Sequence, residues 1–333
     1  MEIKRLEEIK EPLKKAVLTI GNFDGVHLGH QKIIKEVVSE AKKIKGQSVV
    51  MTFDPHPVRF FHPDKEFHLL TLCDEKAKII EKLGVDILLC VRFNNELASL
   101  EPEEFIKAIL VDKIGAKAVI IGRDYRFGKA RKGDIKLLRK ESKRYGFTVK
   151  VVNPVKIKGE TISSTKIRNL ILKGDVKKAS AFLGRPYSIE GIVVKGTGRG
   201  ASILGFPTAN ILSGAELIPQ DGVYAVKVRI EEFSKERAEA RSPKRRGFSE
   251  VTEESLFDGV MNIGKNPTFG NKERTLEVHI LDFNGDIMHK TIKVYFIERL
   301  RKEKRFPSPE ALRKAIKKDI EEAKEILSQR VSL

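Results

Sequence analysis

The chain of 333 residues contains no tryptophan, only two cysteines and no long uncharged apolar run. Cys73 and Cys90 are too few for a disulfide framework, and both lie in apolar patterns, so we expect buried, reduced thiols. No segment approaches the roughly 18 apolar residues that a membrane span needs, and residues 1–8 have no apolar signal core. These absences exclude disulfide-rich secreted proteins and membrane proteins and favour a cytoplasmic, globular one.

Acidic residues are also few relative to basic ones. The chain has 46 Asp and Glu against 64 Lys and Arg, so its formal net charge is +18. Such an excess favours a polyanionic partner, and nucleic acid is one candidate. Paired lysines at 42–43, 177–178 and 317–318 are more typical of solvated helix faces. We therefore favour small phosphate-bearing substrates and keep nucleic-acid binding, with a degenerate nucleotide-binding domain, as the alternative. The length allows about two domains.

Residues 21–30, with the sequence GNFDGVHLGH, are the most informative stretch. They join an apolar, β-branched run at 16–20 to apolar residues at helical spacing over 33–44. Glycines let the backbone approach a ligand, and the free N–H groups of a helix start favour an anion. His27 and His30 share the first helical turn and can donate hydrogen bonds to phosphoryl oxygens. We predict a phosphate site here. Zinc is a weaker alternative, because the stretch lacks two histidines at i and i+4 with a Glu between them, and no cysteine lies nearby.

The first half alternates strands and helices, which predicts a Rossmann-like α/β domain with a parallel sheet and right-handed crossovers. We expect strands at 16–20, 47–53, 86–91, 116–121 and 147–152 and helices at 33–44, 74–83, 102–114 and 134–145.

Two loops follow the carboxyl ends of predicted strands, where ligands bind in such sheets. The sequence DPHP at 54–57 contains two prolines, which stop both strand and helix. A substrate loop and a plain structural turn are both open for it. The loop at 122–128 interleaves arginines and aromatic residues around Asp124, a pattern that can stack on a base or a flavin.

Residues 162–168, with the sequence ISSTKIR, open another helix. Ser163 and Ser164 suit an N-cap, whereas Lys166 and Arg168 add two cations that a cap does not require. Short helices then continue to a linker at 184–186. We predict a domain boundary near 184.

The second half changes to short strands at 187–194, 222–228, 275–281 and 290–297, which predicts a small antiparallel barrel. The Asn-Gly pair at 284–285 predicts a hairpin between the last two strands. A helix after Pro309 has an apolar stripe that should pack on the barrel. The polar insertion at 231–255 has no predicted function.

Candidate ligand-binding residues occur at three places in this half. Gly198 and Gly200 lie in a glycine-rich segment whose N–H groups could bind phosphate. Thr208 and Asn210, two positions apart, point to one side of an extended chain and could hold Mg²⁺ together with ATP oxygens. Glu277 lies on the opposite face of its strand from the apolar residues, where it is either solvent-facing or functional.

These motifs together resemble a known family. Residues 21–30 and 162–168 are similar to the two signatures of the nucleotidyltransferase superfamily with an HxGH box. The intervening DPHP loop and the barrel motifs resemble the bacterial bifunctional riboflavin kinase/FMN adenylyltransferase, the prokaryotic FAD synthetase. The insertion at 231–255 departs from the family pattern.

The resemblance implies an adenylyltransferase domain at 1–184, including short helices at 163–184, and a riboflavin kinase barrel at 185–333. It implies ATP-dependent phosphorylation of riboflavin to FMN, then adenylyl transfer from ATP to FMN, giving FAD and pyrophosphate, with Mg²⁺ as cofactor. ATP and flavins are the expected partners, and nucleic acid and membranes are not.

The expected site residues form four groups. Catalytic residues are His27, His30, Ser164, Arg168 and Glu277; residues for ATP or phosphate are Gly21, Asn22, Phe23, Asp24, Gly25, Asp124, Ser163, Gly198 and Gly200; residues for flavin are Asp54, Pro55, His56 and Pro57; residues for the metal are Thr208 and Asn210. In the family the presumed base of the kinase is a Glu, which corresponds to Glu277.

Overall fold

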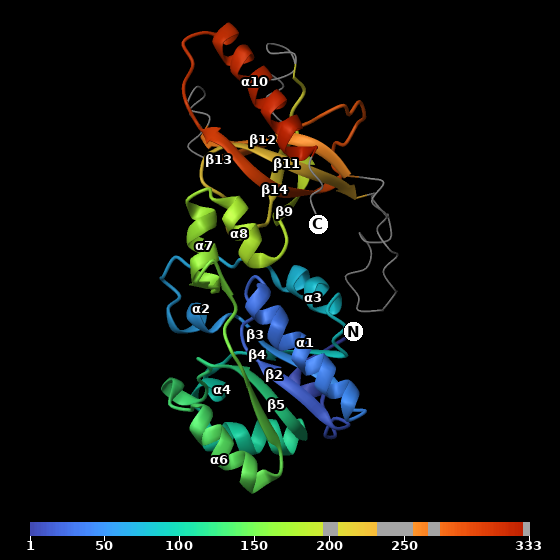
Figure 1. The fold of residues 1–333 in the computed structure, drawn as a ribbon, viewed down its shortest axis with the longest axis vertical. Helices are drawn as coiled ribbons and strands as arrows, with labels where there is room; N and C mark the ends of the chain where they lie inside the picture. The colour runs from blue at the N-terminus through green and yellow to red at the C-terminus, as the bar shows by residue number, and fades with distance from the viewer. Residues whose placement is uncertain (196–205, 232–255, 266–273, 329–333) are drawn as a thin grey trace. The chain divides into compact units, whose positions relative to one another are not determined.

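The computed structural model describes residues 1–195, 206–231, 256–265 and 274–328. These residues form two compact units, Met1–Ser164 and Thr165–Leu333 (Figure 1). The helices between 165 and 184 belong to the second unit by their contacts, whereas the sequence places a boundary near 184, which stays a prediction. Gly198, Gly200 and residues 232–255 of the insertion lie outside the described residues.

The first unit contains a six-stranded sheet in the order β1-β4-β3-β2-β5-β6, and every adjacent pair is parallel. Its strands are β1 (Glu2–Lys4), β2 (Ala16–Ile20), β3 (Ser48–Asp54), β4 (Ile87–Arg92), β5 (Ala116–Gly122) and β6 (Thr148–Val152). The predicted Rossmann-like fold is therefore confirmed. The chain runs outward from β2 through β3 to β4 and then crosses to β5 on the other side of β2. The strand order reverses there, where such sheets bind ligands.

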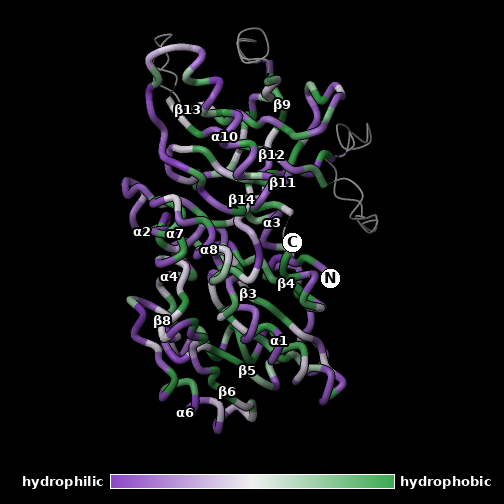
Figure 2. Tube along the Cα trace, turned by 45° about the horizontal axis from the view of Figure 1, so that its top comes forward, coloured by the Kyte–Doolittle hydropathy of each residue, from purple (hydrophilic) through white to green (hydrophobic). Residues whose placement is uncertain are grey.

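Apolar side chains cover both faces of this sheet because neighbouring residues of a strand point to opposite sides. Leu18 of β2 packs in one cluster with Leu110, whereas Val17 packs in another with Val37 and Ala41. All five residues of β2 are buried. In Figure 2 the strands β4 and β5 carry long hydrophobic stretches, as expected for a sheet covered on both faces.

The helices of the first unit largely match the predicted ones. They are α1 (Leu28–Lys43), α2 (Pro57–Phe61), α3 (Cys73–Glu81), α4 (Asn95–Ser99), α5 (Pro102–Glu104) and α6 (Ile135–Tyr145). A π-helix lies at Phe105–Lys113, and 3₁₀ turns lie at Leu6–Glu8 and Lys129–Arg131. Two short strands, β7 (Lys156–Ile157) and β8 (Glu160–Thr161), pair with each other. The helix predicted over 102–114 thus forms as α5 continued by a π-helix.

Two details differ from the predictions. Pro57 begins α2 instead of preventing a helix, because the first helical position has no N–H partner to lose, and His56 caps it by accepting a hydrogen bond from the Val58 N–H (3.1 Å). Cys73 is exposed at the first position of α3, so its predicted burial was wrong. Cys90 is half-buried.

The second unit is a closed antiparallel barrel in the order β10-β13-β12-β11-β14-β9, as predicted. Its elements are α7 (Ser164–Leu172, which starts at the last residue of the first unit), α8 (Val176–Leu183), β9 (Tyr187–Val194), β10 (Ala209–Ser213), β11 (Gly222–Glu231), β12 (Leu256–Lys265), β13 (Arg274–Ile280), β14 (Thr291–Lys302) and α10 (Pro309–Leu327). Ala323 and Leu327 of α10 pack against Val223, Ala225 and Val260, so the predicted docking of this helix on the barrel is confirmed.

The predicted hairpin between the last two strands was wrong. β13 pairs with β10 and β12, whereas β14 pairs with β9 and β11. Both edges of each strand are therefore occupied by other partners. The ten residues from 281 to 290 are also longer than the two-residue loop that an Asn-Gly turn closes, so the local turn signal did not determine the pairing.

Two candidate active sites

The turn after β2 is held in place by a buried carboxylate. Asp24 is 2% exposed, and its Oδ1 accepts hydrogen bonds from the N–H groups of Leu70 (2.9 Å) and Thr71 (3.3 Å). The N–H of Gly25 donates to Thr71 Oγ1 at 3.1 Å. Gly25 has a φ of +80°, which is a conformation that favours glycine. Asp24 thus organises the turn, and its direct contact with ATP stays a prediction.

A second set of contacts fixes the start of the same turn. The carbonyl oxygen of Asn22 accepts hydrogen bonds from Lys76 Nζ (3.0 Å) and from Thr52 Oγ1 (3.1 Å). Lys76 is 5% exposed. Sequence reasoning missed this lysine, although a signal was present, because Lys76 shares the buried face of α3 with Ala77 and Ile80 at helical spacing.

His27 and His30 lie together at the start of α1. His27 is the N-cap, and its Nδ1 accepts a hydrogen bond from the backbone N–H of His30 at 3.3 Å. The two rings stack with centroids 3.6 Å apart and planes at 17°. Gly29 permits this arrangement, since a Cβ atom there would lie 3.0 Å from His27 Cε1. The sequence prediction that the two histidines share one turn is confirmed.

The His30 ring is in a desolvated environment. Its Nδ1 is buried without a hydrogen-bond partner among the described residues, and the Phe23 ring meets it edge-on at 5.2 Å. Burial lowers the pKa of His30 well below its usual value, and positive charge on His27 or Lys76 lowers it further. His30 is therefore neutral at pH 7, and a neutral imidazole can stack closely on its neighbour without charge repulsion.

The two motifs identified in the first half of the sequence meet at one hydrogen bond. Ser164 Oγ donates to the backbone carbonyl of Asp24 at 2.9 Å. Ser163 precedes it directly, so both hydroxyl-bearing residues adjoin the turn of residues 21–27. Arg168 lies one helical turn further along α7, in the second unit, and its catalytic role stays a prediction.

The DPHP segment adjoins a cluster of aromatic rings that sequence reasoning missed. The rings of Phe60 and Phe61, in α2, lie 5.2 and 5.6 Å from the ring of Phe93, which follows β4. Phe61 is 55% exposed, which is unusual for so large an apolar side chain. The cluster lies at the carboxyl ends of adjacent strands, and its rings suit a planar aromatic ligand. The spacing of the phenylalanines in the sequence did not indicate a cluster.

The third loop of this edge follows β5. Tyr125 and Phe127 stack on each other with centroids 5.6 Å apart, and Phe127 is buried. These aromatic residues therefore contribute to packing. Asp124 is exposed, and its contact with a nucleotide stays a prediction.

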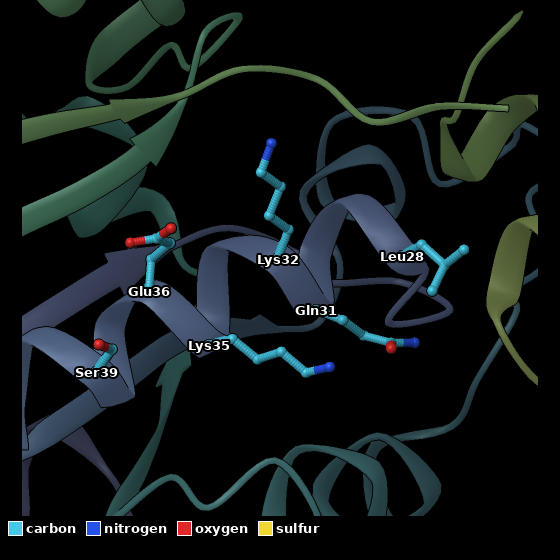
Figure 3. A pocket seen from close by; sticks show the side chains of 6 residues that line it. All are labelled: Leu28, Gln31, Lys32, Lys35, Glu36 and Ser39. Carbon is cyan, nitrogen blue, oxygen red and sulfur yellow. The ribbon is translucent and has the colours of Figure 1, made fainter.

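A hollow of about 480 Å³ lies along α1 (Figure 3). Its lining residues all belong to this helix and are Leu28, Gln31, Lys32, Lys35, Glu36 and Ser39. Neither histidine of the turn lines it, so this hollow does not coincide with the predicted phosphate site.

The barrel brings three polar residues into one row. Glu277 of β13 pairs with Asn210 of β10 on one side and with Asn262 of β12 on the other. Residues paired in this way share a face of the sheet. Burial raises the pKa of the Glu277 carboxyl, and a hydrogen bond with Thr275 acts in the opposite direction. Sequence reasoning assigned no role to Asn262, and only the barrel register places it beside Glu277.

The segment before β10 is held by a histidine. The carbonyl oxygen of Pro207 lies 2.7 Å from His279 Nδ1, which donates when the ring carries its proton there. Thr208 is exposed and Asn210 is half-buried. Among the described residues no three His, Cys, Asp or Glu side chains gather as a metal site. The hydroxyl and amide oxygens of Thr208 and Asn210 are nevertheless hard donors that suit Mg²⁺ completed by substrate phosphates.

The parallel sheet with its glycine–histidine turn, followed by a barrel with a half-buried glutamate, defines a transferase with two catalytic domains. The family described as FAD synthetase matches residues 9–166, and the family described as riboflavin kinase matches residues 183–327. The chain belongs to the bifunctional riboflavin kinase/FMN adenylyltransferase family.

Similar proteins cover nearly the whole chain. The bifunctional riboflavin kinase/FMN adenylyltransferase of Buchnera aphidicola subsp. Schizaphis graminum is 37% identical over 322 residues, which is 96% of each chain. The protein of the same description from Escherichia coli K12 is 37% identical over 308 residues, covering 92% of this chain and 91% of that one. A crystal structure described as a macrolide-efflux protein from Streptococcus pneumoniae has a TM-score of 0.82 and 32% identity, with 97% and 99% coverage. Among the helices of the described residues, none is long and apolar enough to cross a membrane.

Proposed function

We propose that the chain converts riboflavin to FAD in two steps: the barrel phosphorylates riboflavin, and the α/β unit transfers an adenylyl group from ATP to the FMN product. The observation that carries this proposal is that each unit has its own set of gathered polar groups. In one unit the two histidines and Ser164 surround the turn of residues 21–27, and in the other Glu277 lies between two asparagines.

In the kinase step Glu277 accepts the proton of the ribityl 5′-hydroxyl as its oxygen attacks the γ-phosphorus of ATP and ADP leaves. A raised pKa suits this task, because a carboxylate that holds a proton more readily is a stronger base. Thr208 and Asn210 would hold Mg²⁺, which when bound neutralises charge on the phosphates. The rest of the catalysis is positioning.

In the adenylyl transfer step the FMN phosphate is already ionised, so it needs no general base. Its oxygen attacks the α-phosphorus of ATP, and pyrophosphate leaves. His27 and His30, with the N–H groups at the start of α1, donate hydrogen bonds to the charge that develops on the α-phosphoryl oxygens. Arg168 adds a cation, whereas the one proton of the Ser164 hydroxyl is donated to the Asp24 carbonyl, so Ser164 acts by holding the turn. No covalent intermediate is required.

The flavin is proposed to bind at the carboxyl ends of β3 and β4. Asp54, Pro55, His56 and Pro57 lie there, and the exposed ring of Phe61 beside them offers an apolar surface for the isoalloxazine. Mg²⁺ dependence, a cytoplasmic location and the absence of a nucleic-acid or membrane partner belong to the same proposal.

The test is to incubate the purified chain with riboflavin, ATP and Mg²⁺ and to separate the flavins by chromatography. We expect FMN and FAD. The double variant His27→Ala/His30→Ala should accumulate FMN without FAD, because the kinase residues lie on other elements. Loss of both products would contradict separate sites. Assays in which other phosphate acceptors replace FMN test whether the chain is instead a different nucleotidyltransferase of the HxGH group. A chain that binds nucleic acid but makes neither FMN nor FAD would support the nucleic-acid-binding alternative.

A further inference from the structure

We propose that Lys76 is a positioning residue for adenylyl transfer, which holds the carbonyl of Asn22 beneath the turn and places a fixed positive charge beside His30. This inference rests on the adenylyltransferase function proposed above. It concerns a residue that lies outside the sequence motifs and comes from a different element, α3.

The burial of Lys76 needs an explanation. Its side chain lies on the buried face of α3 and is 5% exposed. A buried ammonium group is costly, and an apolar side chain of similar size would pack there with less desolvation. Its two hydrogen bonds go to neutral oxygens, the Asn22 carbonyl at 3.0 Å and Thr52 Oγ1 at 3.4 Å. These contacts direct the ammonium group to the turn.

The contacts of Lys76 reach His30 through two residues. Thr52 Oγ1 also donates to the Asn22 carbonyl, so this one oxygen is held from both β3 and α3. The next residue, Phe23, has a φ of +47°, and its ring edge lies against the His30 ring at 5.2 Å. Fixing the Asn22 peptide therefore fixes the residue that orients His30.

The charge of Lys76 acts on His30 directly. Burial lowers the pKa of His30 most, and positive charge on His27 of α1 or on Lys76 of α3 lowers it further. The rings of His27 and His30 stack at 3.6 Å, where two imidazolium ions would repel. A permanent cation nearby keeps His30 from protonating, so the donor geometry at the helix start is retained as the pH falls.

The experiment separates this role from simple packing. Lys76→Met keeps a long, unbranched side chain but removes the charge and the hydrogen-bond donor. Lys76→Gln keeps a hydrogen-bond donor and removes the charge. Lys78→Met is the matched control, because Lys78 lies on the same helix and gives no hydrogen bond to the turn. The riboflavin kinase activity of each variant is measured on the same sample and reports that the chain is intact.

Two readouts are required. The first is the rate of FAD formation from supplied FMN and ATP between pH 5.5 and 8.5. The second is the titration of His30 by NMR on histidine-labelled full-length protein, with the His30 signal identified by its loss in His30→Gln. The chain has seven histidines, so the spectrum is tractable. The titration does not depend on activity.

We expect Lys76→Met to reduce kcat for FAD formation by about 10- to 100-fold with kinase activity unchanged, as for loss of a buried, charge-assisted hydrogen bond. In both Lys76 variants the His30 midpoint should rise, and the acidic limb of the pH profile should move upward with it. Lys78→Met should stay within about twofold of the unmodified chain.

An unchanged His30 titration in both variants, or full adenylyl transfer by Lys76→Met, would overturn the inference. If neither variant folds, a His30 midpoint in the ordinary histidine range in the unmodified chain would still overturn the inference, because neither burial nor a nearby cation would then act on the ring. If the unmodified chain makes no FAD at all, the proposed function fails, while the titrations still test Lys76.

Discussion

The most informative single change in the barrel is Glu277→Gln, because it is expected to reduce activity and raise stability at once. Glu277 is half-buried, and burial raises the pKa of its carboxyl. The ionised form is therefore less favourable in the folded barrel than in the unfolded chain. Glutamine keeps the shape and removes the charge, so it removes the base and also relieves this cost.

The sign follows from the direction of the pKa change. A carboxyl with a raised pKa in the folded state stabilises the fold while protonated, and it loses this contribution as the pH rises above its ordinary value of 4.5 and through the raised pKa. Glu277→Gln should therefore gain stability relative to the unmodified chain above this range and show no gain below it. The gain should be less than about 1 kcal/mol, since solvent screens a half-buried charge.

Activity should change far more. Loss of a general base costs about 10²- to 10⁴-fold in rate, so FMN formation from riboflavin should fall by this factor. FMN that is supplied directly should still become FAD. Flavins are separated by chromatography after a timed reaction, and the free energy of unfolding is measured with urea between pH 4 and 8.

The matched control is Glu190→Gln, because Glu190 is an exposed glutamate on a strand of the same barrel. It should alter neither activity nor the pH dependence of stability. The reasoning is refuted if Glu277→Gln retains kinase activity within about threefold, which is too small a loss for a general base. It is also refuted if the variant destabilises the barrel at pH 8.

Three further predictions concern other parts of the chain. Asp24→Ala should destabilise the first unit in urea by about 3 kcal/mol, because two buried N–H groups lose a charged acceptor, and FAD formation should fall while FMN formation continues. The Cys73 thiol, whose pKa is lowered to about 7 mainly by a hydrogen bond from Cys90, should be alkylated by iodoacetamide with a midpoint near that pH, and Cys90→Ala should shift the midpoint upward. Leu327→Ala should destabilise the barrel by about 2 kcal/mol, since this side chain of α10 is 3% exposed, whereas an unchanged urea midpoint would show that α10 contributes little.

The sequence was sufficient for most elements of the fold because each one depends on its own residues. The continuous apolar run at 16–20 predicts a strand that is covered on both faces, and β2 is buried throughout. The spacing of apolar residues in α1 and α10 likewise predicts which face packs. The pairing of β13 with β10 and β12 could not be read in this way, because strand partners depend on residues distant in the chain.

The candidate sites show the same division. His27, His30 and Ser164 stand in local motifs, and the structure places them around one turn. Asn262 and the phenylalanine rings near α2 have no local signature. Asn262 becomes a neighbour of Glu277 only through the barrel register, and Phe93 meets Phe61 only because β3 and β4 are adjacent.

Net charge was the least specific guide to function, since the location of a lysine matters more than the number of lysines. Lys150 pairs with Glu36 at 2.7 Å, and Lys177 pairs with Glu298 at 2.8 Å, and all four side chains are at least one-third exposed. Such exposed pairs contribute little to stability, and each pair is neutral, so these two lysines offer no unpaired charge to a polyanion. Lys76, by contrast, falls on the apolar face of its helix. A charged residue within a buried helical face must be justified by what it contacts, and this pattern points to a functional lysine even where the total charge does not.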